Sequence, residues 1–232
     1  MRKQERKYID REQMGKGETK SLSDQRKIIG NNLNFASLEA YKLLRTNLIF
    51  STCDEKNCKI IGVTSALRGE GKSTTAINLA YVLAEAKKKT LLIEGDMRLP
   101  RIQSLLQFHD TPGLSNVLAG VNTFDEAIHS NVFANTLSIL PSGEIPPNPS
   151  ELISSERMRV LLSTLSDSYD YIIIDLPPIT AVSDGLAIST LLSGMLVVVR
   201  PNYCDHRSLA DVMRQMEFLN VKTLGFVVNC RE

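Results

Sequence analysis

One stretch of the sequence, KIIGVTSALRGEGKSTT over residues 59–75, constrains the fold more than any other. Its first part is a short apolar run that predicts a buried strand, and a helical pattern begins at Lys72. Between them, Gly69 and Gly71 allow positive φ angles and a close approach of the backbone to a ligand. A glycine loop between a strand and a helix is the context of a phosphate-binding loop, whose backbone amides converge on phosphate oxygens. We therefore expect a phosphate-binding site here.

The residues that follow the glycines supply the charge and the hydroxyl group that such a site needs. Lys72 would place its ammonium group on the β- and γ-phosphates, and the amino end of the helix adds its dipole. Ser73 offers a hydroxyl group to Mg²⁺. Ala66 stands where the usual pattern begins with glycine, so the match departs from the pattern at its first position.

Composition excludes several other classes of protein. The chain has 232 residues and a net charge of +1, which favours one sizeable α/β domain and gives no case for a nucleic-acid-binding surface. Its four cysteines form no C-x₂-C pair and are expected to be reduced thiols. The longest apolar run, Met195 to Val199, is too short to span a bilayer, and the first ten residues lack the apolar core of a signal peptide. We therefore expect a soluble, cytoplasmic protein whose association with a membrane depends on a partner.

The N-terminal region divides into a polar arm and a helix. Residues 1–30 are charge-rich and basic, which predicts a disordered arm, with a weak contact to an anionic membrane surface as the alternative. Residues 31–232 would form the single domain. Within it, residues 37–50 have helical periodicity, with Ser37 as the expected N-cap. On pattern alone this is an amphipathic helix with ion pairs on its surface.

Strands and helices alternate through the rest of the chain. Apolar runs predict strands over 90–93, 137–140, 171–175, 195–199 and 224–228, and helical patterns are expected over 73–86, 151–166, 183–192 and 205–219. This alternation implies right-handed crossovers. We expect an α/β fold with a mostly parallel sheet and helices on both faces.

Acidic residues stand at the ends of two of these strands. Glu94 and Asp96 follow the strand over 90–93, and Asp175 ends the strand over 171–175. In an open α/β sheet, ligands bind outside the carboxyl ends of the strands. Two carboxylates there, with Arg98 beside them, indicate metal and phosphate binding, and an acid at the position of Asp175 lies next to Mg²⁺ in phosphate-loop proteins. The three histidines lie far apart, and no Ser-His-Asp or Cys-His arrangement is evident.

Five stretches together resemble the bacterial tyrosine kinases of polysaccharide co-polymerase systems. TSALRGEGKSTTAINLA resembles the Walker A motif of that family, LLIEGDMR its Walker A′ motif and YIIIDLPP its Walker B motif. EAYKLLRTN resembles the helix with which the family assembles rings, and IPPNPSELISSERM resembles a segment typical of these kinases. The resemblance extends over nearly all of residues 37–230 and implies a P-loop NTPase fold.

The resemblance also implies an activity and partners. Such a kinase binds ATP with Mg²⁺ and phosphorylates protein tyrosines, mainly on neighbouring copies of itself. It depends on the cytoplasmic tail of a membrane adaptor, which would hold it at the inner face of the cell membrane. Its output is control of capsular or extracellular polysaccharide synthesis and export.

Family motifs assign roles to particular residues of this sequence. The expected catalytic residues are Lys72, Glu94 and Asp96, and the expected ligands of Mg²⁺ are Ser73, Asp96 and Asp175. The nucleotide would be held by the phosphate loop and by two residues beyond it, giving the set Gly69, Glu70, Gly71, Lys72, Ser73, Thr74, Arg98 and Asn229, with Asn229 near the adenine. Ring assembly would use Glu39, Lys42 and Arg45.

Several departures from the family pattern leave alternatives open. Glu94 replaces an aspartate, Arg68 replaces a proline in the loop, and Lys42 replaces the first arginine of the ring motif. The family's C-terminal tyrosine cluster is missing from the sequence given, so either the chain is truncated or Tyr8 on the arm substitutes as the acceptor. One alternative is therefore a kinase-like ATP-binding switch that assembles with its adaptor but transfers phosphate poorly. A partitioning or division-site ATPase is disfavoured, because Leu67 stands where that class has its signature lysine.

Overall fold

A six-stranded sheet, in which every pair of neighbouring strands is parallel, forms the centre of the molecule. The computed structural model describes residues 28–53, 58–133, 136–182 and 184–229. The strand order is β3-β2-β4-β1-β5-β6, so the strand that leads into the glycine loop is flanked on both sides. The strands are β1 (Lys59–Ser65), β2 (Thr90–Glu94), β3 (Leu137–Leu140), β4 (Tyr171–Asp175), β5 (Gly194–Val199) and β6 (Thr223–Val228). The predicted parallel α/β fold is confirmed.

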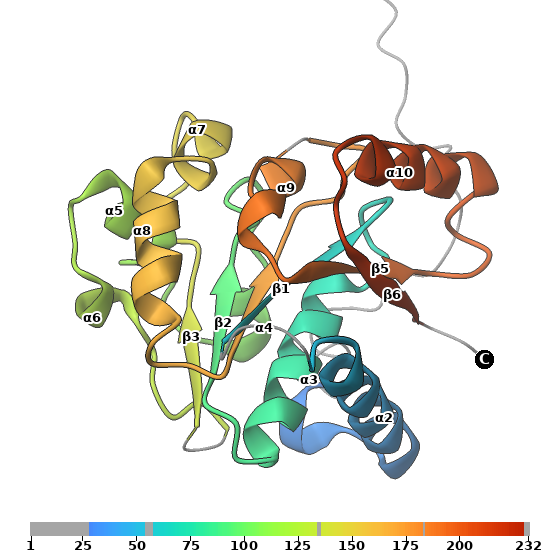
Figure 1. The fold of residues 1–232 in the computed structure, drawn as a ribbon. Coiled ribbons are helices and arrows are strands. Elements are labelled where there is room, and N and C mark those ends of the chain that lie inside the picture. The colour runs from blue at the N-terminus through green and yellow to red at the C-terminus, as the bar shows by residue number, and fades with distance from the viewer. Residues whose placement is uncertain (1–27, 54–57, 134–135, 183, 230–232) are drawn as a thin grey trace, which may run out of the picture.

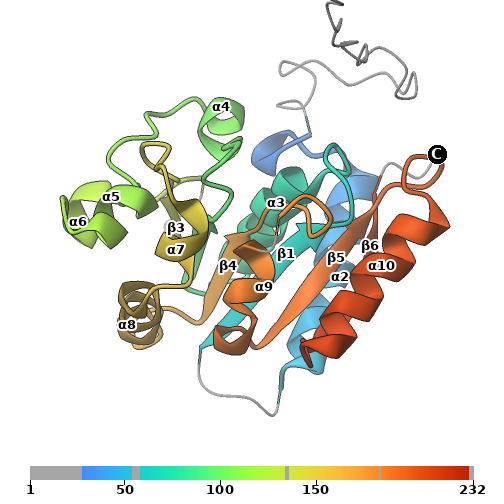
Figure 2. The ribbon, with the colours of Figure 1, turned by 90° about the horizontal axis from the view of Figure 1, so that it is seen from above.

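Helices cover both faces of this sheet, as Figures 1 and 2 show. One face carries α2 (Phe35–Ser51), α3 (Lys72–Glu85) and α4 (Ile102–Leu106). The other carries α5 (Leu114–Ala119), α6 (Phe124–Ala127), α7 (Pro149–Ile153), α8 (Glu156–Leu165), α9 (Asp184–Ala187) and α10 (His206–Phe218). Short 3₁₀ helices occur at Gly30–Asn32 and Ser189–Leu191. Among the described residues, no helix combines the length and apolar character needed to cross a membrane.

The core is divided into two layers by the alternation of side chains along each strand. In β2, Leu92 packs toward α3, whereas Leu91 and Ile93 pack toward the opposite layer of helices. All three side chains are completely buried. The strands therefore consist largely of apolar residues, as expected for a parallel sheet covered on both faces, and the acidic residues Glu94 and Asp175 stand at the carboxyl ends of β2 and β4.

Three predicted helices differ from those observed. The first begins at Phe35 rather than Ser37, because Asn34 is the N-cap and its Oδ1 accepts a hydrogen bond from the Ser37 amide over 2.8 Å. The helix expected over 151–166 is two helices, α7 and α8, because Ser155 caps a new helix at Glu156. The helix expected over 183–192 is α9 followed by a 3₁₀ turn. The first two differences arise from capping residues, whose effect is local and easily hidden inside an apolar pattern.

The chain packs against α3 before residue 31, where we placed the start of the domain. The Asn78 side chain donates a hydrogen bond to the Ile28 carbonyl and accepts one from the Gly30 amide, each over 2.9 Å. Ile29 between them is buried. Most of the predicted basic arm, residues 1–27, lies outside the described residues.

Candidate active site

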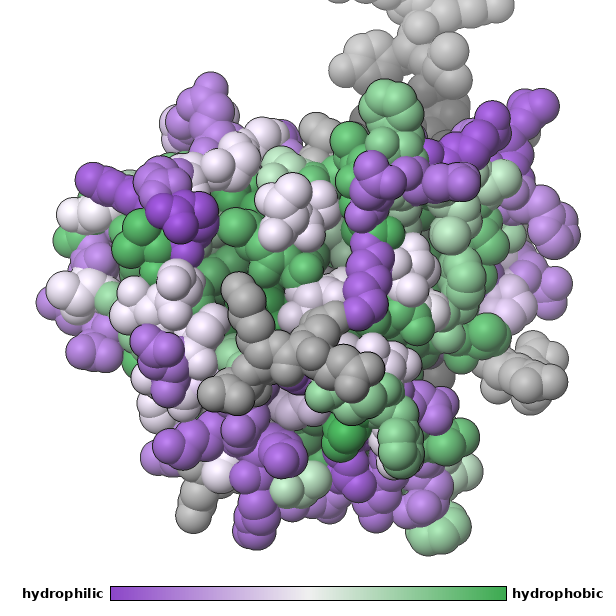
Figure 3. Space-filling model, viewed as in Figure 1, coloured by the Kyte–Doolittle hydropathy of each residue, from purple (hydrophilic) through white to green (hydrophobic). Residues whose placement is uncertain are grey.

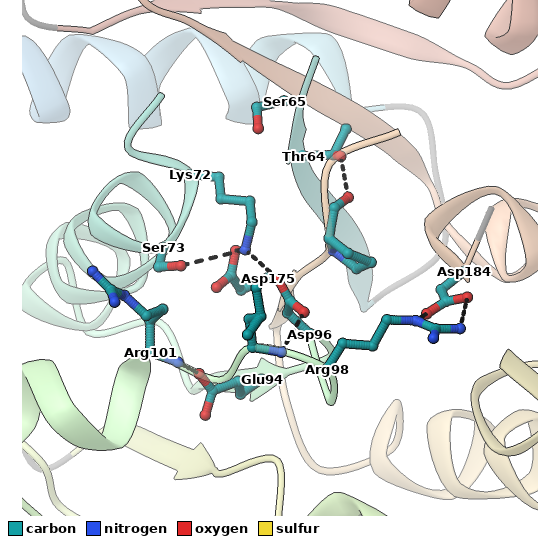
Figure 4. A network of polar contacts seen from close by, with 12 residues as sticks. Thr64, Ser65, Lys72, Ser73, Glu94, Asp96, Arg98, Arg101, Asp175 and Asp184 are labelled. Atoms are coloured by element: carbon teal, nitrogen blue, oxygen red, sulfur yellow. Dashed lines mark hydrogen bonds and ion pairs between the residues drawn. The ribbon is translucent and has the colours of Figure 1, made fainter. Parts of the chain in front are cut away.

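The site lies at the carboxyl ends of β1, β2 and β4, where the glycine loop turns into α3 (Figure 4). Gly69 and Gly71 have φ angles of +84° and +93°, which L side chains rarely adopt. A Cβ atom on Gly71 would lie 1.9 Å from Nδ2 of Asn229. The strand, loop and helix thus have the arrangement that the sequence predicts, and glycine is required at the second position by both conformation and space.

Lys72 and two aspartates form the polar centre of the site. The Nζ atom of Lys72 lies 3.0 Å from Oδ2 of Asp96 and 3.4 Å from Oδ1 of Asp175. Ser73 completes the group, with its Oγ 3.5 Å from the same ammonium. All four residues are at least nine-tenths buried. Residues that are distant in the sequence therefore converge, and they include every residue that we assigned to Mg²⁺.

This group contains one buried ammonium group, that of Lys72, and two carboxylates, so its negative charges outnumber its positive ones. Burial alone would lower the pKa of Lys72, but the Asp175 and Asp96 carboxylates outweigh it and raise that pKa. Burial raises the pKa of Asp175, against the opposing effects of Lys72 and Ser73. The ammonium group is therefore kept charged, and the surrounding negative charge is only partly neutralised.

The Oδ2 atom of Asp175 is a candidate ligand for a bound cation. Oδ2 of Asp175 is buried and has no hydrogen-bond partner, and such atoms are rare in folded proteins. Within the described part of the chain, no three His, Cys, Asp or Glu side chains form a metal cage. Mg²⁺ does not need one, since it is bound by one or two carboxylates together with phosphate oxygens and water. Ser73, Asp96 and Asp175 are thus a suitable set of protein ligands for Mg²⁺.

Glu94 is adjacent to this group but is turned away from it. Its Oε1 accepts hydrogen bonds from the amides of Arg101 and Ile102, the latter over 2.6 Å, and its Oε2 lies 3.4 Å from the Ser142 amide. The side chain is completely buried, and this burial raises its pKa to about 7. The side chain of Glu94, one methylene longer than the aspartate of the family pattern, reaches the amino end of α4. Its catalytic role stays a prediction.

Arg98 also points away from Lys72 (Figure 4). Its Nε donates to Oδ2 of Asp184 over 2.8 Å, and its Nη2 donates to Oγ of Ser150 over 2.8 Å. Ser150 in turn donates to Asp184 over 2.5 Å. The predicted nucleotide ligand is thus engaged in a network that joins the end of β2 to α7 and α9.

Two other predicted ligands of the nucleotide support the loop from behind. The buried carboxylate of Glu70 accepts hydrogen bonds from the Leu67 amide over 2.6 Å and the Arg200 amide over 3.1 Å. Asn229 donates from Nδ2 to the carbonyl oxygen of Glu70 over 2.7 Å. Their side chains fix the shape of the loop, and Thr74 is partly exposed in the first turn of α3.

Sequence reasoning missed Asp184 and Ser150, which hold Arg98, and a tyrosine beside the loop. The hydroxyl group of Tyr203 donates to the Arg68 carbonyl oxygen over 2.9 Å. A usable signal existed for Tyr203, because it follows the apolar strand β5 at the carboxyl end, where ligand sites form. No comparable signal marked Asp184, which lies on a short helix.

The fold and the loop define a class of nucleotide-binding P-loop proteins, and comparisons with known proteins agree. Residues 58–223 match the AAA domain family. The structure of the septum site-determining protein MinD from Pyrococcus horikoshii, complexed with Mg-ADP, aligns with a TM-score of 0.61 and 26% identity over 74% of this chain and 70% of that one. The predicted P-loop NTPase fold is confirmed.

Within that class, closer similarity is found to tyrosine kinases. Tyrosine-protein kinase YwqD of Bacillus subtilis is 37% identical over 191 residues, which are 82% of this chain and 80% of YwqD. The structure of the kinase domain of the Escherichia coli tyrosine kinase ETK aligns with a TM-score of 0.81 and 30% identity over 89% of this chain and 82% of that one. The chain belongs to the bacterial tyrosine kinase family, which confirms the resemblance seen in its motifs.

Proposed function

We propose that this kinase transfers the γ-phosphoryl group of ATP to tyrosine hydroxyl groups, mainly on other copies of itself, at the site around Lys72. The proposal rests above all on one observation, the convergence of Lys72, Asp96 and Asp175 at the end of a glycine loop. Phosphoryl transfer needs little covalent participation by the protein, so positioning and neutralisation of charge dominate the catalysis. The site contains groups for both.

The residues divide the work by their chemistry. The loop amides and Lys72 would hold the phosphates of ATP, and Ser73, Asp96 and Asp175 would hold Mg²⁺, which when bound supplies charge neutralisation to the phosphates. The unpartnered Oδ2 of Asp175 supports this assignment. Because Lys72 is paired with Asp96 and Asp175 in this structure, its ammonium group would exchange these carboxylates for the phosphates of ATP when Mg²⁺ binds.

We further propose that the protein assembles with itself and with the cytoplasmic tail of a membrane adaptor, which holds it at the inner face of the membrane. Its role would be to regulate synthesis and export of capsular or extracellular polysaccharide. The surface of α2 supports an assembly role, since Phe35, Leu43 and Phe50 are exposed there. In Figure 3, hydrophobic residues reach the surface among hydrophilic ones at the lower right, where Figure 1 places α2.

Incubation of the protein with radiolabelled ATP and Mg²⁺, with and without the adaptor tail, tests the proposal. We expect label on tyrosine that is mapped by mass spectrometry and is absent from Lys72→Met. Lys88→Met is the matched control, because Lys88 is an exposed lysine just beyond the end of α3 and has no assigned role in the site or in assembly. Full phosphotyrosine formation by Lys72→Met would overturn the assignment of the site.

A second candidate, a kinase-like ATP-binding switch that transfers phosphate poorly, is favoured by the contacts of Glu94. The Glu94 carboxylate accepts hydrogen bonds from the amides of Arg101 and Ile102 and is turned away from Lys72 (Figure 4), so it is already engaged in structural contacts. Tight binding of ATP without phosphotyrosine, on the protein or on a supplied tyrosine-rich peptide, would favour the switch. Turnover of the peptide would exclude it.

A further inference from the structure

A tyrosine that lies against the phosphate loop has no role in the function described so far. Tyr203 is in the segment between β5 and α10, and its hydroxyl group donates a hydrogen bond to the Arg68 carbonyl oxygen over 2.9 Å. A Cβ atom on Gly69 would lie 3.1 Å from the same hydroxyl oxygen. The guanidinium carbon of Arg200 is 5.1 Å from the centre of its ring. Tyr203 is therefore a contact of the loop itself.

The exposure of Tyr203 distinguishes it from the other described tyrosines. It is 38% exposed, whereas Tyr41, Tyr81 and Tyr169 are half-buried and Tyr171 is buried in β4. For phosphorylation, the tyrosine hydroxyl oxygen must enter the active site of another copy and line up with the γ-phosphorus and the leaving oxygen of ATP. Of the tyrosines that the structure describes, Tyr203 offers the most accessible side chain.

We propose that Tyr203 is a phosphoryl acceptor of this kinase and that its phosphorylation weakens nucleotide binding by the loop beside it; this inference rests on the proposed function. Tyr203 Oη attacks the γ-phosphorus of ATP bound to another copy. The Oη–P bond forms, the bond from the γ-phosphorus to the β,γ-bridging oxygen breaks, and ADP leaves with that electron pair. The hydroxyl proton passes to a basic group or to water.

The direction of the transfer follows from the side of the loop on which Tyr203 lies. In a phosphate loop the backbone amides face the phosphates, so the carbonyl groups point outward. The Tyr203 hydroxyl group is bound to such a carbonyl, that of Arg68, and therefore lies on the outer side of its own loop. Another copy of the kinase is the donor that can reach it.

The effect on the loop follows from charge and hydrogen bonding. A phosphotyrosine has no hydroxyl hydrogen to donate at Oη, so the bond to the Arg68 carbonyl cannot persist. The phosphate group adds a charge of about −1.5 to −2 next to a site that must attract the phosphates of ATP. Arg200, whose guanidinium already lies over the ring, can pair with the new phosphate and hold Tyr203 away from the loop.

Phosphorylation of inactive protein by active protein tests the site. Wild-type kinase is incubated with labelled ATP, Mg²⁺, the adaptor tail and Lys72→Met, and phosphotyrosine is mapped in the inactive protein. We expect label at Tyr203, its loss in the Lys72→Met/Tyr203→Phe double variant, and its retention in a matched double variant with Tyr169→Phe. Mapping of wild-type protein after autophosphorylation gives the same information if Lys72→Met does not fold.

A polymer of glutamate and tyrosine in the same reaction separates the two proposals. Label on the polymer without label on Tyr203 would overturn this inference and leave the kinase intact. Label on neither would overturn both. For the regulatory effect, affinity for a fluorescent ADP is measured before and after incubation with ATP. We expect it to be roughly tenfold weaker in phosphorylated wild-type protein and unchanged by the incubation in Tyr203→Phe. Equal affinities in phosphorylated and unphosphorylated wild-type protein would overturn that effect.

Discussion

The side-chain amide of Asn229 donates a hydrogen bond to the Glu70 carbonyl oxygen over 2.7 Å, which ties the end of β6 to the phosphate loop. Asn229→Ala should therefore weaken binding of ADP and of inorganic pyrophosphate by the same factor, roughly threefold to tenfold. Isothermal titration calorimetry measures both, with Asn122→Ala, at a surface asparagine, as control. A loss confined to ADP would mean that Asn229 contacts the base instead.

Gly71→Ala should abolish nucleotide binding while the protein still folds. The new Cβ would lie 1.9 Å from the Asn229 amide, and a φ of +93° is strained for alanine. The matched control is Gly185→Ala, whose Cβ would lie 3.4 Å from the Leu176 side chain, an ordinary contact. Circular dichroism checks the fold and ADP titration the site. Normal ADP affinity in Gly71→Ala would show that the loop rearranges without cost.

Glu94→Ala should lower the free energy of unfolding by roughly 1–3 kcal/mol, because it leaves the amides of Arg101 and Ile102 without an acceptor. Glu94→Gln keeps an acceptor oxygen and should lose less. Urea denaturation measures both variants. If Glu94→Gln is as stable as the wild type but loses about 10²-fold or more in phosphoryl transfer, Glu94 acts on the substrate as well. An alanine variant with wild-type stability would contradict the structural role.

Asp184→Asn should destabilise the protein at neutral pH by roughly 1–3 kcal/mol, since it weakens the bond to Arg98. Burial alone would raise the pKa of Asp184, but hydrogen bonds from Arg98 and Ser150 outweigh it and lower that pKa below its ordinary 3.8. A carboxylate with a lowered pKa stabilises the fold above its unfolded pKa, and this contribution is lost as pH falls through its folded pKa.

The difference in unfolding free energy between wild-type protein and Asp184→Asn should therefore be constant near neutrality and shrink below about pH 4. Denaturation of both proteins across a pH series measures this difference directly. A difference that stays the same down to the acid limit of folding would show that the charge of Asp184 is unimportant. Asp211→Asn, at an exposed helical ion pair, is the control and should change stability little.

Glu39→Ala/Lys42→Ala should reduce self-assembly without destabilising the fold. The two side chains pair with each other over 3.0 Å on the surface of α2, and exposed pairs contribute little stability. Arg45 differs, because its Nη1 donates to the Val82 carbonyl oxygen of the same chain over 2.7 Å. Arg45→Ala should therefore lower stability whether or not the protein assembles. Light scattering gives the mass in solution, and an unchanged mass in the double variant would contradict an assembly role for these two residues.

The sequence allowed prediction of the features that depend on local pattern. The apolar strands, the glycine loop and the acids at strand ends all carry signals that operate within a few residues. Hence Lys72, Asp96 and Asp175 could be placed together before their distances were known, because carboxyl ends of parallel strands meet at one edge.

What could not be predicted is the direction in which each side chain is held. Glu94 and Arg98 stand beside Asp96 in the sequence, yet one binds the amino end of α4 and the other binds Asp184. These choices depend on partners distant in the sequence, whose positions are set by the tertiary fold. The predicted starts of α2 and α8 were wrong for a related reason, because Asn34 and Ser155 act as N-caps through single hydrogen bonds.

The clasp that Asn78 forms on Ile28 and Gly30 has a mechanical consequence. Asn78 belongs to α3, the same helix that begins with Lys72. The segment over residues 28–30 is thus hydrogen-bonded to α3, the helix whose amino end carries Lys72. A force that pulls on the chain ahead of Ile28 would therefore act on α3 first, and on the sheet only through that helix.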